Sequence, residues 1–371
     1  MFRFIHTSDL HLGKRFGRMP EEFRGRLTEA RHGSLGRLQE VARAQGASTI
    51  LVAGDVFDTE TPSPAVLRQA LHAMGDDPAL RWVLIPGNHD SLAADDLWEI
   101  AARDCPANVT LALAPEPVVL AEGVVLLPAP CPSRRPGRDL TDWMEEASTQ
   151  PEALRIGLAH GAVQTFGEDG ASDVITPDRA ERAGLNYLAL GDWHGQIRIG
   201  DRCWYSGSPE QDRFKHDAPG KCLAVALEGP GASPSVTPVD TGKFRWEILD
   251  LHLLPDEDPA ERLRGMLPRK DRRQTLLRII AEGRTRLSGQ AGIAEALNGE
   301  APDFAFVEYR DTGLGLDVDV GDLDEIDQAG ALRQAAEALL AESGDDSLSS
   351  DGRDTARAAL SRLYAYAMEA S

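Results

Sequence analysis

Five short polar clusters carry residue types that can bind metal ions. Their Asp, His and Asn side chains form a mixed oxygen and nitrogen ligand set that suits hard or borderline divalent ions. A carboxylate can bridge two such ions ~3.5–4 Å apart, and the pair can bind the attacking and leaving oxygens of a phosphoryl displacement. None of the clusters contains Cys, which disfavours a structural zinc site. In chain order the clusters are Asp9-Leu10-His11, Gly54-Asp55-Val56-Phe57-Asp58, Gly87-Asn88-His89-Asp90, His160-Gly161 and Gly191-Asp192-Trp193-His194.

The positions of the clusters carry more weight than any single motif. Asp, Asn and Gly are turn formers, so a lone Asp-x-His or Gly-Asn-His-Asp would ordinarily be a loop. Here the clusters follow apolar, β-branched runs such as residues 2–8, 48–54 and 81–86, which we expect to be strands. Residues 21–45 and 64–74 have apolar side chains at helical spacing. This β-α-β-α-β order predicts a parallel sheet whose strands end at the polar clusters.

The rest of the chain divides into three predicted parts. An α/β domain over residues 1–243 is completed by strands at 118–127, 154–159, 187–190, 197–205 and 222–227 and by a loop at 229–238. A small α+β domain is expected over residues 244–325, with strands at 246–254, 274–281, 304–309 and 316–320. Residues 326–371 are predicted to be an acidic, helical tail.

Composition excludes several classes of protein. Of the 371 residues 42% are hydrophobic and 27% charged, which excludes wholesale disorder. The chain has no apolar run of the ~18 residues that a membrane span needs, and it begins without the apolar segment of a secretory leader. Four widely spaced cysteines predict reduced thiols, so we expect a cytoplasmic protein. Because no G-x-x-x-x-G-K-[ST] is present, an ATP-driven step would need a partner.

The charge is unevenly distributed. A net charge of −21 argues by itself against a nucleic-acid partner. From Arg262 to Arg286, however, nine basic residues stand against two acidic ones, a local charge of +7. Such a segment favours contacts with a phosphate backbone, and a solvated charged face is the alternative. The candidate DNA contacts in it are Arg269, Lys270, Arg272 and Arg273.

The ordered set D-x-H, G-D-x-x-D, G-N-H-D, a later single His and G-x-x-H resembles the calcineurin-like metallophosphoesterases. The form of Gly-Asn-His-Asp and the segment Tyr205-Ser206-Gly207-Ser208-Pro209-Glu210 are similar to the DNA repair exonuclease branch, the SbcD and YhaO type. The resemblance covers most of the chain. It implies an α/β-β/α sandwich, two sheets flanked by helices, as the catalytic domain. It also implies an α+β cap that could bind DNA, and a helical tail that could dock a partner.

The resemblance implies a site with two divalent metal ions. Manganese is the expected metal, with magnesium, iron and zinc as alternatives. His89 would contact the phosphate and act as the general acid, a role that suits imidazole near neutral pH. Asp58 and Asp90 would orient loops or ligands, although Asp90 could instead cap a helix over residues 92–101. The implied ligands are Asp9, His11, Asp55 and His194 for one ion, and Asp55, Asn88, His160 and Asp192 for the other.

One position departs from the family pattern. The family usually has Gly-His-x-His where this chain has Gly-Asp-Trp-His, so Asp192 replaces a histidine. A third carboxylate lowers the net charge of the loaded site from +2 to +1, which weakens phosphate attraction and favours hard ions such as manganese. The alternative is that Asp192 lies outside the ligand set and the second ion is held weakly.

The function that we expect is a metal-dependent DNA repair exonuclease or endonuclease, a hydrolase acting on phosphodiester bonds. A phosphodiesterase for small molecules such as cyclic nucleotides is one alternative. A non-catalytic scaffold that binds DNA ends within an ATPase complex is another. The expected partners are DNA and an SMC-like coiled-coil ATPase, with a homodimer as a further option and no membrane.

Overall fold

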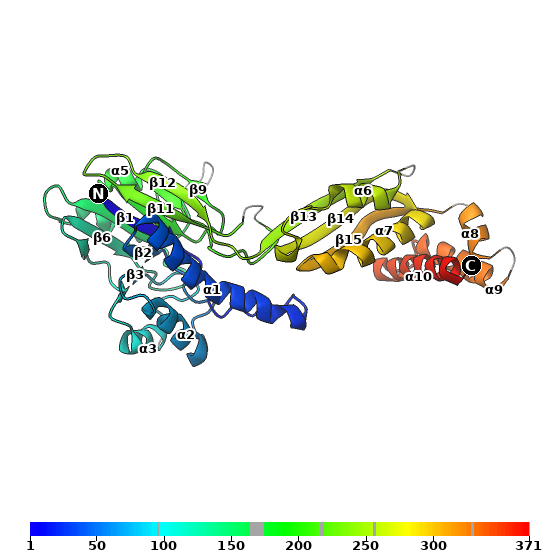
Figure 1. Cartoon of the computed structure of the whole chain (residues 1–371), viewed down its shortest axis with the longest axis horizontal. Helices are drawn as coiled ribbons and strands as arrows, with labels where there is room; N and C mark the ends of the chain where they lie inside the picture. Colours follow the sequence, from blue (N-terminus) through cyan, green and yellow to red (C-terminus); the bar gives the residue numbers. More distant parts are fainter. Residues whose placement is uncertain are drawn as a thin grey trace. The chain divides into compact units, whose positions relative to one another are not determined.

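The structure is a computed structural model, and it forms two compact units, Met1–Arg245 and Trp246–Ser371 (Figure 1). Each unit is described by itself. The residues that the structure describes are 1–94, 96–163, 174–215, 219–254, 257–318, 320–327 and 330–370. None of the helices in these ranges is long and apolar enough to cross a membrane.

The first unit contains a six-stranded sheet in the order β12-β11-β1-β2-β3-β4. Strands β1 to β4 are parallel, and β11 returns antiparallel beside β1. The strands are β1 (Phe2–Thr7), β2 (Thr49–Val52), β3 (Arg81–Leu84), β4 (Val109–Leu111), β11 (Lys221–Leu227) and β12 (Ser235–Asp240). Helices α1 (Glu21–Gln45), α2 (Pro64–Gly75) and α3 (Leu97–Asp104) contribute to the apolar core of this sheet.

A second six-stranded sheet has the order β5-β6-β7-β8-β10-β9. Strands β6, β7, β8 and β10 are parallel, and β5 and β9 lie antiparallel at the two edges. The strands are β5 (Val118–Ala121), β6 (Val124–Ala129), β7 (Leu154–His160), β8 (Tyr187–Gly191), β9 (Ile197–Arg198) and β10 (Cys203–Tyr205). The short helices α4 (Trp143–Glu146) and α5 (Arg179–Arg182) share a core with this sheet.

The two sheets face each other across a common apolar core. Phe4 of β1 meets Tyr187 of β8 with ring centroids 5.5 Å apart, and both side chains are fully buried. Burial of a large apolar side chain contributes about 1.5–3 kcal/mol, so this layer stabilises the unit strongly. The helices lie on the outer faces, in separate cores. The predicted α/β-β/α sandwich is therefore confirmed.

Local sequence signals explain the helix boundaries. Helix α1 ends at Gly46, whose left-handed conformation (φ 63°) lets its N–H reach the last carbonyl groups of the helix. Helix α2 begins with Pro64 behind Ser63, whose side chain accepts a hydrogen bond from the Val66 N–H. These signals are typical of helix ends, and both helices begin at the residues predicted.

Several strand predictions were wrong. The predicted loop at residues 229–238 contains the start of β12, a solvent-exposed edge strand that pairs with β11. Its proline and polar residues hide it in the sequence, and an edge strand tolerates both. The predicted strand at 118–127 is a hairpin, because Gly123 adopts a positive φ between β5 and β6. Strand β4 was not predicted at all.

The second unit is built on a three-stranded sheet in the order β13-β14-β15. Its strands are β13 (Arg245–Leu253), β14 (Thr275–Arg286) and β15 (Phe306–Asp317), and α6 (Pro259–Met266) and α7 (Leu287–Glu300) share their core. The strand predicted at 304–309 lies largely in β15. Of the strand predicted at 316–320, only Leu316 and Asp317 belong to β15, and Val320 already begins α8. Helices α8 (Val320–Ile326), α9 (Ala331–Ser343) and α10 (Ser350–Ala370) form a further apolar cluster with Leu287 of α7. Whether residues 326–371 are a separate domain stays a prediction.

Candidate metal centre

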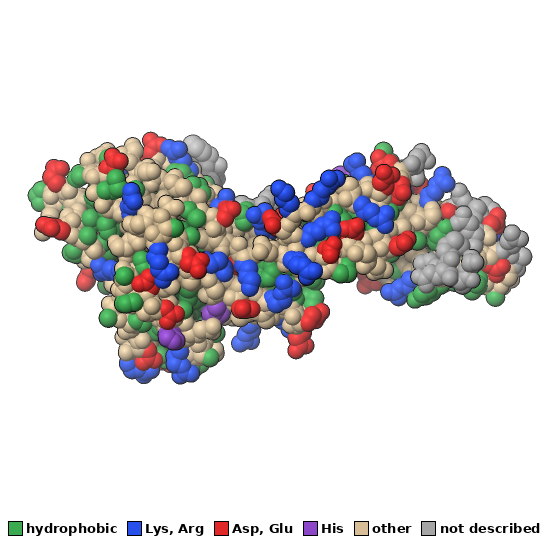
Figure 2. Space-filling view, in the orientation of Figure 1, with side chains coloured by type: hydrophobic (Ala, Val, Ile, Leu, Met, Phe, Trp, Pro, Cys, Tyr) green, Lys and Arg blue, Asp and Glu red, His purple; other side chains and the backbone are tan. Residues whose placement is uncertain are grey.

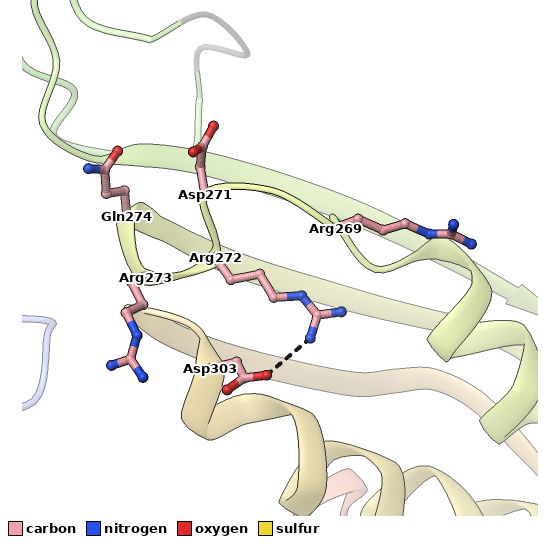
Figure 3. A pocket seen from close by; sticks show the side chains of 6 residues that line it. All are labelled: Arg269, Asp271, Arg272, Arg273, Gln274 and Asp303. Carbon is pink, nitrogen blue, oxygen red and sulfur yellow. Dashed lines mark hydrogen bonds and ion pairs between the residues drawn. The ribbon is translucent and has the colours of Figure 1, made fainter.

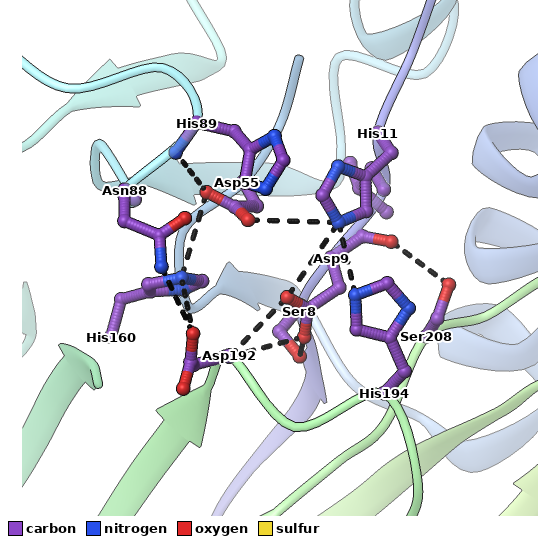
Figure 4. A network of polar contacts seen from close by, with 12 residues as sticks. Ser8, Asp9, His11, Asp55, Asn88, His89, His160, Asp192, His194 and Ser208 are labelled. Carbon is purple, nitrogen blue, oxygen red and sulfur yellow. Dashed lines mark hydrogen bonds and ion pairs between the residues drawn. The ribbon is translucent and has the colours of Figure 1, made fainter. Parts of the chain in front are cut away.

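The five polar clusters meet at one edge of the first unit. The parallel strands of both sheets end there, so that His160 at the end of β7 lies 3.5 Å (Nε2 to Oδ1) from Asp55, which follows β2. Figure 4 shows that the side chains of the clusters lie close together around a common centre. The structure thus brings together all seven residues expected to bind metal, and their role as ligands stays a prediction. They are Asp9, His11, Asp55, Asn88, His160, Asp192 and His194.

The backbone at these strand ends is strained. Asp9, His11, Asp55 and Asp192 all have a positive φ, between 43° and 102°. Each such conformation costs a non-glycine residue of order 1–3 kcal/mol, and it persists only where the surroundings impose it. Backbone hydrogen bonds impose it here, from the Asp9 N–H to the Gly54 carbonyl at 3.1 Å and from the His11 N–H to the Asp55 carbonyl at 2.9 Å.

Two glycines leave room for ligand side chains. A Cβ atom at Gly54 would collide with the ring of His160, and one at Gly87 would collide with the Asp55 carboxylate. Gly54 also has a φ of +83°, which side chains rarely adopt. The glycines of G-D-x-x-D and G-N-H-D are therefore required by close packing against the charged groups of the site.

The first group of possible ligands contains Asp9, His11 and His194, whose ligand atoms lie within 4.8 Å of one another. The Nε2 atoms of His11 and His194 face each other at 3.2 Å. With the Nδ1 protons directed at Asp58 (3.3 Å) and Asp212 (3.6 Å), the two Nε2 lone pairs face each other and repel, whereas a shared cation would accept both. The arrangement therefore fits a metal ion.

The second group contains Asp9, Asp55 and His160. The Nδ1 atom of His160 lies 2.8 Å from the Ala53 carbonyl, which can only accept, so Nδ1 carries the proton. Nε2 then faces the site, where it is buried and has no hydrogen-bond partner among the described residues. A metal ion would satisfy this atom, so the second group also fits a bound cation.

Asp55 connects the two groups. Its Oδ2 lies 3.6 Å from His11 Nε2, and its Oδ1 lies 3.5 Å from His160 Nε2. One carboxylate oxygen therefore faces each group, as a bridging ligand requires. Burial raises the pKa of Asp55, but the nearby imidazoles of His160 and His11 outweigh burial and lower it, so that the group stays ionised. Burial lowers the pKa of His160, but Asp55, Asp9 and Asp192 outweigh it and raise the pKa to about 9.

Asp192 lies beside the second group. Its Oδ1 is 3.8 Å from His160 Nε2 and accepts a hydrogen bond from Asn88 Nδ2 at 3.0 Å. Its backbone N–H lies 3.3 Å from the Asp9 carboxylate. Burial raises the pKa of Asp192, and the charges of Asp9 and Asp55 add to this effect. Asp192 is thus close enough to serve either as a ligand or as the residue that orients Asn88.

His89 is held by its backbone and by its ring. Its N–H donates to Asp55 Oδ1 at 2.9 Å, and its Nδ1 donates to the Asp58 carbonyl at 3.0 Å. Nε2 is therefore the nitrogen that can exchange a proton. The ring meets that of His11 edge to face, with centroids 4.9 Å apart, so His89 lies at the border of the first group.

Asp58 and Asp90 support the loops. Asp58 Oδ1 lies 3.3 Å from His11 Nδ1, on the side of the ring away from the site. Asp90 is fully buried and accepts hydrogen bonds from the backbone N–H groups of Phe57 (3.0 Å) and Gly87 (2.6 Å), which ties two of the clusters together. Burial and the charge of Asp55 raise its pKa to about 7. The helix-cap alternative for Asp90 was wrong, because α3 begins only at Leu97.

The sequence motifs missed a layer of residues behind the ligands. Asp212 is the main one: its buried carboxylate lies 3.6 Å from His194 Nδ1 and forms ion pairs with Lys14 (2.9 Å) and Arg213 (2.8 Å). Ser8 and Ser208 bind Asp9, through its carboxylate (2.5 Å) and its carbonyl (2.8 Å) respectively. One feature of the sequence could have indicated Asp212: it comes shortly after strand β10, which ends at the same edge as the other strands.

The four basic residues predicted to bind DNA lie in the second unit, and three of them, Arg269, Arg272 and Arg273, line a pocket of about 360 Å³ (Figure 3). Arg272 already has acidic partners, because it forms ion pairs with Glu300 (2.7 Å) and Asp303 (3.4 Å). Arg269, Lys270 and Arg273 are exposed and form no ion pair with a described residue. Two further arginines of the basic segment also have acidic partners from outside it, namely Arg278 with Glu308 and Arg284 with Asp317. The local charge of +7 is therefore partly neutralised, and Figure 2 shows basic and acidic side chains interspersed on the visible face of this unit.

Residues 2–196 match the sequence model of the calcineurin-like phosphoesterases, so the chain belongs to that family of metal-dependent phosphoesterases. A Rhodobacter capsulatus protein, named as the D subunit of nuclease SbcCD, is 32% identical over 257 residues, 56% of this chain and 62% of the relative. A Bacillus subtilis protein of the same name is 38% identical over 93 residues, 24% of this chain and 22% of the relative. The chain thus covers less than two thirds of either relative.

Among solved structures, TT1561 of Thermus thermophilus aligns with a TM-score of 0.38 and 11% identity, over 56% of this chain and 89% of that one. The resemblance predicted from the five motifs is confirmed by the family match and by the curated relatives.

Proposed function

We propose that this chain is a nuclease that hydrolyses phosphodiester bonds of DNA at the site formed by the five clusters. The observation that carries the proposal is the position of Asp55 between two groups of possible ligands, with His89 hydrogen-bonded to Asp55 at the border. Two ions held a few ångströms apart by a shared carboxylate suit in-line displacement at phosphorus. The relatives, which are named as part of a nuclease, support a nucleic acid as the substrate.

Each group of residues has a role in this proposal. Asp9, His11 and His194 would hold one ion, Asn88 and His160 the other with Asp192, and Asp55 would bridge. When bound, two divalent ions supply activation of water and neutralise the charge that develops on the phosphoryl oxygens. His89 would deliver the proton on Nε2 to the leaving sugar oxygen, since the Asp58 carbonyl fixes its other nitrogen.

Manganese is the metal that we propose, with magnesium, iron and zinc as alternatives. The residues around the second group are Asp9, Asp55, Asp192 and the Asn88 amide, with one imidazole from His160. This oxygen-rich set favours hard ions over zinc.

We further propose that the chain acts in DNA repair in the cytoplasm, together with a coiled-coil ATPase. The name of the relatives describes one part of a complex, which supports a partner. Leu332 and Tyr366 of α9 and α10 are exposed and could contact it. The exposed residues Arg269, Lys270 and Arg273 are our candidates for contacts with the DNA backbone.

Two other functions remain as alternatives. A phosphodiesterase for small molecules would use the same metal centre but would not need the second unit of 126 residues, Trp246–Ser371. A non-catalytic DNA-end-binding scaffold would not need His89, yet this side chain is fixed by hydrogen bonds from both its backbone and its ring. These observations favour the nuclease.

The proposal is tested with purified protein, manganese, labelled single- and double-stranded DNA, and bis-p-nitrophenyl phosphate. We expect wild type to cleave DNA, and His89→Ala to lower kcat by ~10²–10⁴-fold without loss of metal. His72→Ala is the matched control, because His72 is an exposed residue of α2 and should leave activity unchanged. No DNA cleavage by wild type, or undiminished cleavage by His89→Ala, would refute the proposal. Cleavage of the small ester alone would support the small-molecule alternative.

A further inference from the structure

A second basic pocket opens directly beside the metal-binding side chains. It encloses about 170 Å³, several times the ~30 Å³ that a water molecule occupies in the liquid. Asn88, His160 and Asp192 form its boundary with the metal centre, and Arg134, Arg135 and Arg138 line another part of it. None of the three arginines was assigned a role above.

The three arginines have no acidic partner in the described part of the chain. Arg134, Arg135 and Arg138 are exposed at the surface, and no hydrogen bond or ion pair links them to a described residue. Other arginines of the same unit do have acidic partners, as Arg37 has in Glu210 at 2.6 Å. Guanidinium groups that line one pocket and have no acidic partner among the described residues are available to bind an anion there.

The nearest carboxylate in the sequence is engaged elsewhere. Asp139, next to Arg138, pairs with the buried Arg179 at 2.8 Å and accepts hydrogen bonds from Thr141. Arg179 also pairs with Asp142 and Glu145, so the segment that follows the arginines is fixed to helix α5. The arginines therefore lie next to an anchored segment, and Asp139 is not available to neutralise them.

The remaining wall of the pocket is apolar. Pro136, Leu140 and Ile175 line it together with the arginines. A pocket with guanidinium groups on one side and apolar surface on another suits a nucleotide, whose phosphate is anionic and whose sugar and base have apolar faces. Arginine is also the residue best suited to bidentate binding of phosphate.

We propose that the pocket of Arg134, Arg135 and Arg138 binds a second phosphate of the substrate, next to the phosphodiester that is hydrolysed. The inference rests on the proposed function, because it assumes that a phosphodiester occupies the metal centre. The second phosphate comes either from the end of a strand or from its backbone. In both cases the pocket selects substrates with at least two phosphates.

The test compares substrates with one and two phosphates at a fixed ionic strength. Bis-p-nitrophenyl phosphate and TpT contain one phosphate, whereas pTpT, TpTp and TpTpT contain two. The test variant is the triple substitution Arg134→Ala, Arg135→Ala, Arg138→Ala. The control is Arg3→Ala, Arg68→Ala, Arg103→Ala, which removes the same charge from exposed positions outside the pocket.

We expect wild type to prefer a two-phosphate substrate over TpT in kcat/KM by ~10-fold or more, the effect of losing a hydrogen bond to a charged group. The test variant should lose this preference and retain its activity on bis-p-nitrophenyl phosphate, and the control should retain both. A preference for pTpT or TpTp identifies a terminal phosphate, and a preference for TpTpT alone identifies a backbone phosphate.

Three outcomes would overturn the inference while leaving the proposed function intact. They are equal cleavage of one- and two-phosphate substrates by wild type, a preference that survives in the test variant, and an equal loss on all five substrates in that variant. Failure of wild type to cleave any of the five would instead refute the proposed function, and the inference with it.

Discussion

Asn88 donates a hydrogen bond from Nδ2 to Oδ1 of Asp192 at 3.0 Å, across the junction of the two sheets. The bond fixes the amide so that its Oδ1 remains available to a cation, and it uses only one oxygen of the carboxylate. The same Oδ1 lies 3.8 Å from His160 Nε2, so this one oxygen of Asp192 both orients Asn88 and faces the second group. A histidine at this position, as in the family pattern, would offer one nitrogen for one partner.

The first prediction concerns metal content. Asp192→Ala should reduce bound manganese from about two ions per chain to about one. The substitution removes the carboxylate that lies beside the second group and orients Asn88. Elemental analysis after gel filtration measures the content, with circular dichroism to verify folding. Asp192→His, which recreates the family pattern, should restore two ions. Two ions retained in Asp192→Ala would remove Asp192 from the ligand set.

The second prediction concerns Asp212, which the sequence motifs did not indicate. Burial raises the pKa of its carboxyl group, but hydrogen bonds from His194 and Arg213 and the charge of Arg31 outweigh burial and hold the pKa well below its usual range. Asp212→Asn should lower manganese affinity by ~10–100-fold, the usual cost of losing the group that orients a ligand histidine. Calorimetric titration measures it. Asp240→Asn, at an exposed ion pair, is the control and should bind as wild type does.

The third prediction is a pH dependence of metal binding. The pKa of His160 is about 9 in the metal-free protein, because surrounding carboxylates outweigh the effect of burial. Below that pH the ion must displace a proton from Nε2, so affinity should rise with pH by up to about tenfold per unit and level off above pH 9. Calorimetry at pH 7 in buffers of different ionisation enthalpy counts the protons. Binding without any proton release at pH 7 would contradict the prediction.

The fourth prediction concerns acid stability and His6, which lies in β1 away from the candidate ligands. Its Nε2 lies 3.1 Å from the Leu190 carbonyl and its Nδ1 3.0 Å from the Tyr187 hydroxyl, which joins the two sheets. Burial lowers its pKa from 6.5 to about 3. The unfolded chain takes up this proton below pH 6.5 and the folded protein does not, so stability is lost as the pH falls from 6.5 to about 3.

This loss has a limiting slope of about 1.4 kcal/mol per pH unit for one proton. Urea unfolding of metal-free protein across that range should show a smaller slope in His6→Gln than in wild type. His72→Gln, at an exposed site, should keep the wild-type slope. Identical slopes in wild type and His6→Gln would show that His6 is protonated in the folded state.

The fifth prediction separates two kinds of basic residue in the second unit. Removing Arg269, Lys270 and Arg273 together should weaken DNA binding and reduce the slope of log K against log salt by roughly 2–3, about 0.9 for each phosphate that is no longer neutralised. Arg272→Ala should leave that slope unchanged and lower stability instead, because Arg272 pairs with Glu300 and stacks on Phe304. Fluorescence anisotropy at several salt concentrations distinguishes them. Equal slopes in wild type and the triple variant would exclude these residues as DNA contacts.

Sequence was sufficient where a local pattern determines the structure. Helix α1 was predicted over its whole length, and the clusters met because parallel strands end at a common edge. Sequence was insufficient where a contact depends on the tertiary structure. Asp212 becomes part of the site only through Lys14 and His194, which are distant in sequence. Likewise, no composition rule could show that Arg278 would be neutralised by Glu308 of the neighbouring strand.

The antiparallel pairing of β1 with β11 has a consequence for the order of folding. Phe2 to His6 pair with Leu227 to Leu223, so the first strand gains its second neighbour only after more than 220 residues have been synthesised. Asp9 also depends on Ser208, which comes almost as late. Contacts of such long sequence separation form slowly. A nascent chain on the ribosome would therefore lack an ordered catalytic centre until nearly the whole first unit had emerged.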